Sequence, residues 1–251
     1  MEVQPDLSVL VAAPGQAALI RRFLGALYGK ADHVGLETFV AVSDPTGDDA
    51  LLAEEFPALT LVEYNGAGPP GRFVNEILER SRGRYFSLWD QSAVIADGCL
   101  AALVDFLDEV PDAGIVGPKI RDESGRIQPV ARRFPSVFSL FFSSSPLPGR
   151  PDSGWGEYVS GEADWFAGPG MVVNRCLLDE INGIHPRLSG SFWQIELCRQ
   201  AKRCGWHTHY LHDAQATGSL ERWQAAMGGI GAGMVRRLWE VCLLMWPRRH
   251  G

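Results

Sequence analysis

The first residues with chemical potential lie where an apolar run ends. Trp89-Asp90-Gln91-Ser92 follows a segment typical of a buried strand and places a carboxylate beside an amide. Hard cations prefer carboxylate oxygens, so Asp90 is a candidate cation ligand and Gln91 is a weaker one. Successive side chains of an extended chain point to opposite sides, so the two do not serve the same site automatically. A solvated carboxylate at a strand end is the other interpretation of Asp90.

Aromatic and imidazole side chains are the next candidates. Trp165 and Trp193 either stack on sugar rings, which flat aromatic faces suit, or belong to the core, and for Trp193 we favour the stacking role. His207, His209 and His212 alternate at strand spacing, which puts the first two on one face. Because no acidic or Cys partner follows in a recognisable spacing, we predict no metal site there.

These residues need a scaffold, and the first half of the chain predicts a parallel sheet covered by helices. Short apolar runs alternate with helical patterns, as in doubly wound folds. Strands are predicted at 7–13, 38–42, 59–63, 85–89 and 114–118. Helices are predicted at 16–28, 48–56, 71–82 and 98–110, the first with Leu19, Phe23, Leu24 and Leu27 on its apolar face.

The second half has a different pattern. A hairpin is predicted over 121–130 around Ser124-Gly125, followed by a long loop over 141–162. A further ordered segment is expected at 164–174, with helices at 175–181 and 194–204 and a strand at 207–211. Residues 219–246 are predicted to be helical.

Composition excludes some classes of protein. The 251 residues carry a net charge of -7, which argues against a nucleic-acid binder. The five cysteines form no Cys-x-x-Cys pair, so neither a disulfide framework nor a zinc site is indicated. No run reaches the ~20 apolar residues needed to span a bilayer, and the N-terminus lacks the pattern of a secretion signal. We therefore expect a cytoplasmic protein.

Three longer phrases carry a family resemblance: RGRYFSLW (82–89), PDAGIVGPKIRDESGRIQPVARRFPS (111–136) and the segment at 183–206. In this order and at these separations they resemble the rhamnosyltransferase-like branch of the family 2 glycosyltransferases. The resemblance covers about 7–218 and implies an α/β GT-A fold. It further implies a nucleotide-sugar donor over the first strands and a divalent metal that bridges the diphosphate. A carboxylate would deprotonate the acceptor hydroxyl in an inverting transfer.

The positions to which the resemblance assigns chemistry are substituted. Gln91 stands where the metal-binding carboxylate is expected, and Gln194 stands at the position of the catalytic base. An amide does not accept a proton near neutral pH. Glu196 lies two residues on, and we interpret it as an acid that caps the first turn of the 194–204 helix rather than as a displaced base.

The remaining positions follow by resemblance. Ser43, with Asp44 beside it, falls at the nucleotide-recognising Asp, and Gly218 falls at the late His of the metal site. Arg72 and Asn75 are candidate donor contacts. The acceptor side keeps Asp164, together with Trp165 and Trp193, and the glycine turn 168–170. The Gly-Pro cluster at 66–71 has no phosphate-binding fingerprint and is interpreted as a plain loop.

Two functions follow from this pattern. The first is a glycosyltransferase-like protein of cell-surface polysaccharide assembly that has lost or strongly reduced transfer activity and binds a nucleotide sugar, a glycan or a partner enzyme. No cofactor is expected in that case. The alternative is an active inverting transferase that uses Asp44, Asp90 and Glu196 in shifted roles, and only this alternative leaves room for Mg or Mn.

The C-terminal segment gives the domain plan. Residues 1–218 form the predicted GT-A domain, and 219–251 form a helical appendage. Its end places apolar residues between Arg236-Arg237 and Arg248-Arg249, which suits a homodimer interface, packing against the domain, or peripheral contact with the inner membrane. We rank the first two above the membrane.

Overall fold

The computed structural model describes residues 4–12, 17–42, 50–56, 58–64, 70–135, 157–188 and 192–226. Its strands are β1 (Leu7–Ala12), β2 (Leu36–Val42), β3 (Leu59–Glu63), β4 (Tyr85–Asp90), β5 (Val94–Ile95), β6 (Ala113–Arg121), β7 (Ala131–Arg132), β8 (Gly161–Ala163), β9 (Trp165–Phe166), β10 (Met171–Asn174) and β11 (His207–Thr217). Its helices are α1 (Ala17–Gly29), α2 (Ala50–Glu55), α3 (Pro70–Arg80), α4 (Cys99–Glu109), α6 (Arg175–Glu180), α7 (Phe192–Arg203) and α8 (Leu220–Ala226).

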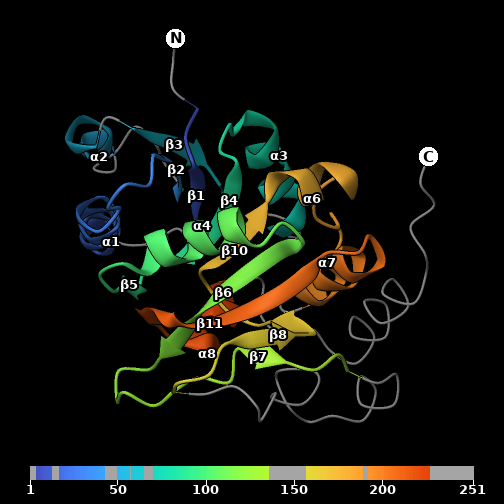
Figure 1. The fold of residues 1–251 in the computed structure, drawn as a ribbon. Helices are drawn as coiled ribbons and strands as arrows, with labels where there is room; N and C mark the ends of the chain where they lie inside the picture. Colours follow the sequence, from blue (N-terminus) through green and yellow to red (C-terminus); the bar gives the residue numbers. More distant parts are fainter. Residues whose placement is uncertain are drawn as a thin grey trace.

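One mixed sheet organises the described residues. Its strands follow the order β3-β2-β1-β4-β10-β6-β11-β5, and β8 pairs with β11. β1 runs parallel to β2 and β4, and β6 runs parallel to β11, whereas β10 is antiparallel to both of its neighbours. Figure 1 shows α2 and α3 toward one end of the sheet and α8, β7 and β8 toward the other. The predicted α/β fold with a mostly parallel sheet is confirmed.

The sheet is buried on both faces, as the apolar strands predict. All six residues of β4 are buried, and eight of the nine residues of β6 are buried. α1 packs on this sheet through Ile20, Phe23, Leu24 and Leu27. The prediction that Leu19 joins that face was wrong, because Leu19 is 36% exposed and Ile20 takes the inward position.

Several predicted boundaries shift in the second half. α7 begins at Phe192, two residues before the predicted start, and β11 continues to Thr217 instead of ending at 211. Residues 161 and 162, expected at the end of the long loop, belong to β8, which pairs with β11. The hairpin around Ser124-Gly125 is confirmed by the Arg121–Ile127 bridge and by the bond from the Gly125 amide to the Asp122 carbonyl. Of the predicted helix at 219–246, the part beyond 226 lies outside the described residues.

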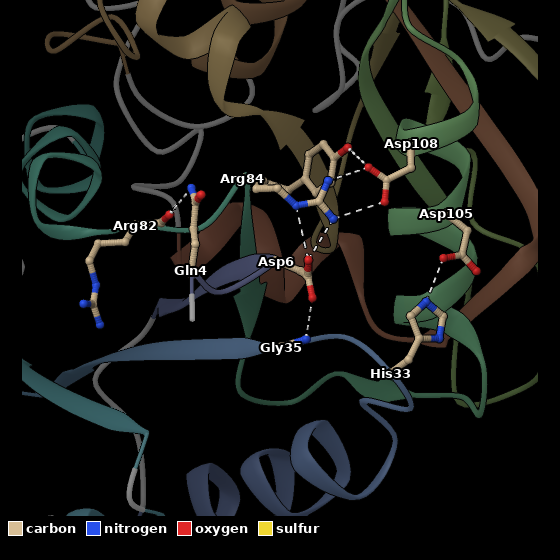
Figure 2. A network of polar contacts seen from close by, with 9 residues as sticks. Gln4, Asp6, His33, Gly35, Arg82, Arg84, Asp105 and Asp108 are labelled. Atoms are coloured by element: carbon tan, nitrogen blue, oxygen red, sulfur yellow. Dashed lines mark hydrogen bonds and ion pairs between the residues drawn. The ribbon is translucent and has the colours of Figure 1, made fainter. Parts of the chain in front are cut away.

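The amino-terminal ends of the parallel strands are joined by ion pairs (Figure 2). Arg84, just before β4, donates to Asp6 at 2.7 Å and to Asp108 of α4 at 2.6 Å. Asp6 also accepts the Gly35 amide at 2.8 Å, which ties in the start of β2. His33 lies 2.8 Å from Asp105 on α4. This network holds β1, β2, β4 and α4 together at the end of the sheet away from the candidate site.

Within the described ranges no helix is both long and apolar enough to cross a membrane.

Candidate functional site

The candidate site lies at the carboxyl ends of β4, β6 and β11, where open α/β sheets bind their ligands. The turn after β4, the hairpin after β6 and the junction between β11 and α8 meet there, and α1 completes one wall. They enclose an open cleft of about 680 Å³, lined among others by Ser92, Thr217 and Gly218. The residue after the metal-motif position and the residue at the late-His position therefore face the same space.

Gln194, at the predicted base position, is an internal connector. Its side chain has no solvent exposure. Its Nε2 donates to the Gly168 carbonyl at 3.0 Å, and its Oε1 accepts from Trp223 Nε1 of α8 at 3.3 Å. An amide can make both bonds, whereas a carboxylate lacks the donor for the first. The residue joins the glycine turn to α8 and presents no basic atom to an acceptor.

The glycine turn at 168–170 is shaped by close packing. Gly170 has φ +81°, and a Cβ there would meet the Trp89 ring at 2.6 Å. Gly168 has φ +141°, and its Cβ would lie 3.0 Å from the Leu220 side chain. Glycine is needed at both positions because L side chains rarely adopt these angles. The turn is thus packed between β4 and α8, and its Gly168 carbonyl is the acceptor for Gln194.

Glu196 is buried, and its interpretation as a helix cap was wrong. α7 begins at Phe192 and has no acidic residue in its first turn, so Glu196 lies one turn further in. It is 3% exposed, and its Oε1 accepts from Gln200 Nε2 at 2.8 Å. Because α7 starts earlier than predicted, Glu196 lies in the second turn of the helix and is buried against the protein core.

The metal-motif region does not resemble a cation site. Asp90 is 6% exposed, so its interpretation as a solvated loop carboxylate was wrong. Its Oδ1 accepts the Ser92 amide at 2.5 Å, which closes the turn after β4. The buried Oε1 of Gln91 accepts no hydrogen bond from the described residues, and Gly218 has no side chain to offer. Among the described residues no cluster of three His, Cys, Asp or Glu side chains could hold a metal ion.

The two residues predicted to contact the nucleotide-sugar donor differ in their surroundings. Asn75 is committed to the fold: its amide donates to the Ile184 carbonyl at 2.7 Å and accepts the Ile184 amide at 2.8 Å. Both ends of that side chain are therefore occupied by the loop after α6, contrary to the predicted donor role. Arg72 is exposed in the first turn of α3. Ser43, Asp44 and most of the cluster at 66–71 lie outside the described residues.

The candidate acceptor residues are packed inward. Trp165 is fully buried and donates its Nε1 to the Arg133 carbonyl at 3.0 Å, and Trp193 is 2% exposed. Neither ring offers a face for sugar stacking in this arrangement, so the core interpretation holds. Asp164 accepts the Phe134 amide at 3.0 Å and the Lys202 ammonium at 3.1 Å. The two rings are therefore packed inside, whereas Asp164 is half-buried and lines, with Lys202, a small pocket of about 160 Å³ beside α7.

Burial lowers the pKa of two basic side chains in this region. Burial lowers the pKa of Arg132 to about 10, and its guanidinium lies 5.8 Å from the Trp165 ring centre. Burial likewise lowers the pKa of His209, whose ring lies 6.3 Å from that of His207 on the same strand face. That shared face was predicted.

Sequence reasoning missed the side chains that line the open cleft. Arg22, Arg126, Gln128, Glu221 and Arg222 come from three separate segments and are of types common on any surface. Only the hairpin motif Asp122-Glu123-Ser124-Gly125 offered a local signal. The cleft exists because the ends of β6 and β11 lie side by side.

Comparison with known proteins gives the fold and a distant sequence relationship. No family model matches the sequence. Over 126 residues, 47% of this chain, it is 26% identical to an N-acetylglucosaminyl-diphospho-decaprenol L-rhamnosyltransferase of Mycobacterium tuberculosis. The match spans 41% of that relative, less than half of its length.

Solved structures agree with the fold. A mannosyltransferase from Pyrobaculum calidifontis in complex with GDP-Man and Mn2+ superposes with a TM-score of 0.59 at 20% identity, over 86% of this chain and 57% of that one. Residues 1–349 of S. aureus TarS superpose with a TM-score of 0.60 at 15% identity, over 96% and 70% of the two chains. The chain has the GT-A glycosyltransferase fold and is a distant relative of the rhamnosyltransferase-like enzymes of family 2.

Proposed function

We propose that this chain is a GT-A domain of cell-surface polysaccharide assembly that binds a nucleotide sugar or a glycan, and whose sugar-transfer activity is lost or strongly reduced. The observation that carries the proposal is the double hydrogen bond of Gln194 to Gly168 and Trp223. General base catalysis needs a side chain that accepts a proton within reach of the acceptor hydroxyl. Here that position holds a buried amide whose two polar atoms are already bonded.

The metal position supports the same proposal. A leaving diphosphate is stabilised by a hard cation on carboxylate ligands. Asp90 is used by the turn that it caps, and Gln91 and Gly218 supply no carboxylate or imidazole. The chain therefore lacks, in the described region, the set of ligands that a bridging Mg or Mn would need, and we propose binding without a metal.

The alternative of an active inverting transferase requires Asp90 and Glu196 in shifted roles. Their burial at 6% and 3% exposure and their existing hydrogen bonds count against it. Asp44, the third residue of that alternative, lies outside the described residues. The similar structures contain GDP-Man with Mn2+ or UDP-GlcNAc, which makes nucleotide sugars the first ligands to test.

The test is a calorimetric titration of the full chain with UDP-, GDP- and dTDP-sugars, with and without Mn2+, combined with an assay for released nucleoside diphosphate. We expect any donor affinity to change by less than about twofold with Mn2+, and no release above the rate in buffer. Tightening of tenfold or more by Mn2+ together with diphosphate release would overturn the proposal. Absence of binding by every donor would remove its nucleotide-sugar part and leave a glycan or protein partner.

Two further parts of the function stay predictions. One is the division of the chain at 218. The other is the role of the C-terminal segment in a homodimer, in contact with a partner glycosyltransferase or at the inner membrane, which involves residues beyond 226 that lie outside the described part of the chain. The cytoplasmic location rests on the sequence alone. Flotation of the full chain with anionic vesicles and light scattering of the free protein test these predictions directly.

A further inference from the structure

The open cleft contains polar side chains that the fold does not use. Arg22 of α1, Thr217 and Glu221 line it, and none of these side chains bonds to another described residue. The Arg126 guanidinium lines it too and attracts the Asp122 carboxylate, with no hydrogen bond between the two side chains. They come from four places in the chain: α1, the hairpin, the end of β11 and α8. Polar groups that converge from separate elements and lack internal partners are a feature of ligand sites.

One wall of the cleft is held rigid before any ligand binds. Asp122 Oδ1 accepts the Ser124 amide at 3.0 Å and the Arg126 amide at 2.9 Å, and Oδ2 accepts from Gln128 Nε2 at 2.9 Å. The hydrogen bond from the Ser124 hydroxyl, with those amide bonds, lowers the pKa of Asp122, so the carboxylate keeps this role at neutral pH. A preorganised wall reduces the entropy lost on binding.

The opposite wall is tied to the hairpin. Arg222 of α8 pairs with Glu123 at 3.0 Å, and the Gly218 amide donates to the Arg121 carbonyl at 2.8 Å. These bonds set the width of the cleft between α8 and the hairpin tip. Its volume of about 680 Å³ falls in the range of about 300–1,000 Å³ typical of small-ligand pockets.

The balance of charge selects the class of ligand. Three arginines, at 22, 126 and 222, face three carboxylates, at 122, 123 and 221. A diphosphate needs a surplus of cations or oriented amides, and this lining has no cationic surplus. Sugar hydroxyls both donate and accept, so guanidinium, carboxylate, amide and hydroxyl groups together match a polyhydroxylated neutral ligand.

We propose that this cleft binds a short neutral oligosaccharide rather than the diphosphate of a donor. The inference rests on the proposed function, which it sharpens by naming the ligand class and the side chains that contact it. Arg22 donates to a pair of neighbouring hydroxyls, and Glu221 accepts from a hydroxyl on the α8 side. The described residues that line the cleft include no aromatic ring, so we expect hydrogen bonds to supply the affinity and Kd to be on the order of 1 mM.

The test is an NMR titration of the 15N-labelled full chain with neutral di- to tetrasaccharides of rhamnose, mannose, galactose and N-acetylglucosamine, and with inorganic pyrophosphate and UDP as anionic probes. We expect at least one saccharide to shift the amides of Ser124, Thr217 and Gly218. Arg22→Ala and Glu221→Ala should each weaken that binding by at least about fivefold, the loss of one hydrogen bond to a charged group. Arg203→Ala, an exposed charge on α7 outside the cleft, is the matched control and should change nothing.

Two outcomes overturn the inference. One is tighter binding of pyrophosphate than of any saccharide at these same amides. The other is the absence of shifts at these amides with every saccharide at about 50 mM, well above the expected Kd. Nucleotide sugars that bind without Mn2+ elsewhere would then leave the proposed function intact. Saccharide binding here together with Mn2+-dependent transfer would instead keep the inference and refute the loss of activity.

Discussion

The two ends of the central sheet both carry charged side chains and use them in opposite ways. At the amino-terminal end Arg84 is shared between Asp6 and Asp108, and His33 meets Asp105 (Figure 2). At the carboxyl end Arg22 and Glu221 have no bonded partner among the described residues, although they line one cleft. Charges that satisfy one another stabilise the fold, and charges left without partners are available to a ligand.

A second contrast lies within the carboxyl end itself. The wall beside α7, which the family resemblance assigns to catalysis, is closed by Gln194, Trp223 and the glycine turn. The cleft between the hairpin and α8 is open. The position that the resemblance assigns to the base is packed and bonded, while a neighbouring concave surface has polar groups with no hydrogen bond to a described residue.

The largest expected effect on the free energy of unfolding is at Trp223, which bonds to Gln194 beside the glycine turn. Trp223→Ala should lower the free energy of unfolding by about 3–5 kcal/mol, because it removes a large buried ring and the donor to Gln194. Trp223→Phe keeps most of the ring and should cost only about 1 kcal/mol. Urea unfolding measures both. A Trp223→Ala loss below about 1 kcal/mol would show that α8 does not close the site.

Gln194→Glu is the next test, because it restores an acid where the family resemblance places the base. We expect a loss of about 2–4 kcal/mol at pH 7, since the buried carboxylate cannot donate to the Gly168 carbonyl. Burial should raise the folded pKa of this Glu above about 4.3, so the loss is complete above the raised pKa and shrinks as the pH falls below it. Thermal melts across pH measure this.

Gln91→Glu is the matched comparison for Gln194→Glu. Gln91 is partly exposed as a residue, although its Oε1 is buried, and it has no hydrogen bond to a described residue to lose, so the new carboxylate should cost less than at position 194. Equal losses at the two positions would contradict the view that position 194 is a closed connector. Metal-dependent transfer by the Gln194→Glu, Gln91→Glu double variant would contradict it as well.

A smaller effect on the free energy of unfolding is expected where Arg84 binds Asp6 and Asp108 at the amino-terminal end of the sheet. The hydrogen bond from Arg84 holds the pKa of Asp108 below its usual 3.8, so this carboxylate stabilises the fold above that pH. That contribution is lost as the pH falls through the lowered folded pKa. Asp108→Asn should therefore cost about 1 kcal/mol at pH 7, reduced by the partial exposure of the pair, and almost nothing near pH 2. Asp105→Asn, which loses one exposed contact, is the control and should cost less.

The smallest effect on stability is expected in the open cleft. Arg22→Ala and Glu221→Ala should each change the free energy of unfolding by less than about 0.5 kcal/mol, because neither side chain bonds to a described residue. The same substitutions should weaken saccharide binding. A larger loss of stability would place these residues with the structural charges and erase the contrast between the two ends of the sheet.

Much of the fold follows from local pattern. The patterns that predict strands at 59–63 and 85–89 match β3 and β4 within one residue. β4 is buried along its whole length, as its apolar run predicts, and β3 at the sheet edge is buried only in part. The ends were less predictable. β11 extends to Thr217 because pairing with β6 continues past a register shift, which no local pattern reveals.

The candidate site was only half predictable. Sequence comparison by motif located Gln91 and Gln194 as amides in place of acids, because that substitution is visible in the residue type alone. The sequence did not reveal that the Asn75 side chain binds the Ile184 backbone. Nor did it reveal that Glu196 is buried and bonded to Gln200. The first contact depends on how the loop after α6 packs against α3, and the second depends on a helix start two residues earlier than predicted.

The residue types alone indicated an alternating α/β fold and, through the family resemblance, amides at the positions assigned to metal ligation and proton removal. Only the tertiary structure decided what those amides do, since Gln194 bonds to Gly168 and Trp223, each more than 25 residues away in the chain. The cleft beside them is also a tertiary product. Its arginines and carboxylates come from segments about 200 residues apart, and only the folded sheet brings them to one surface.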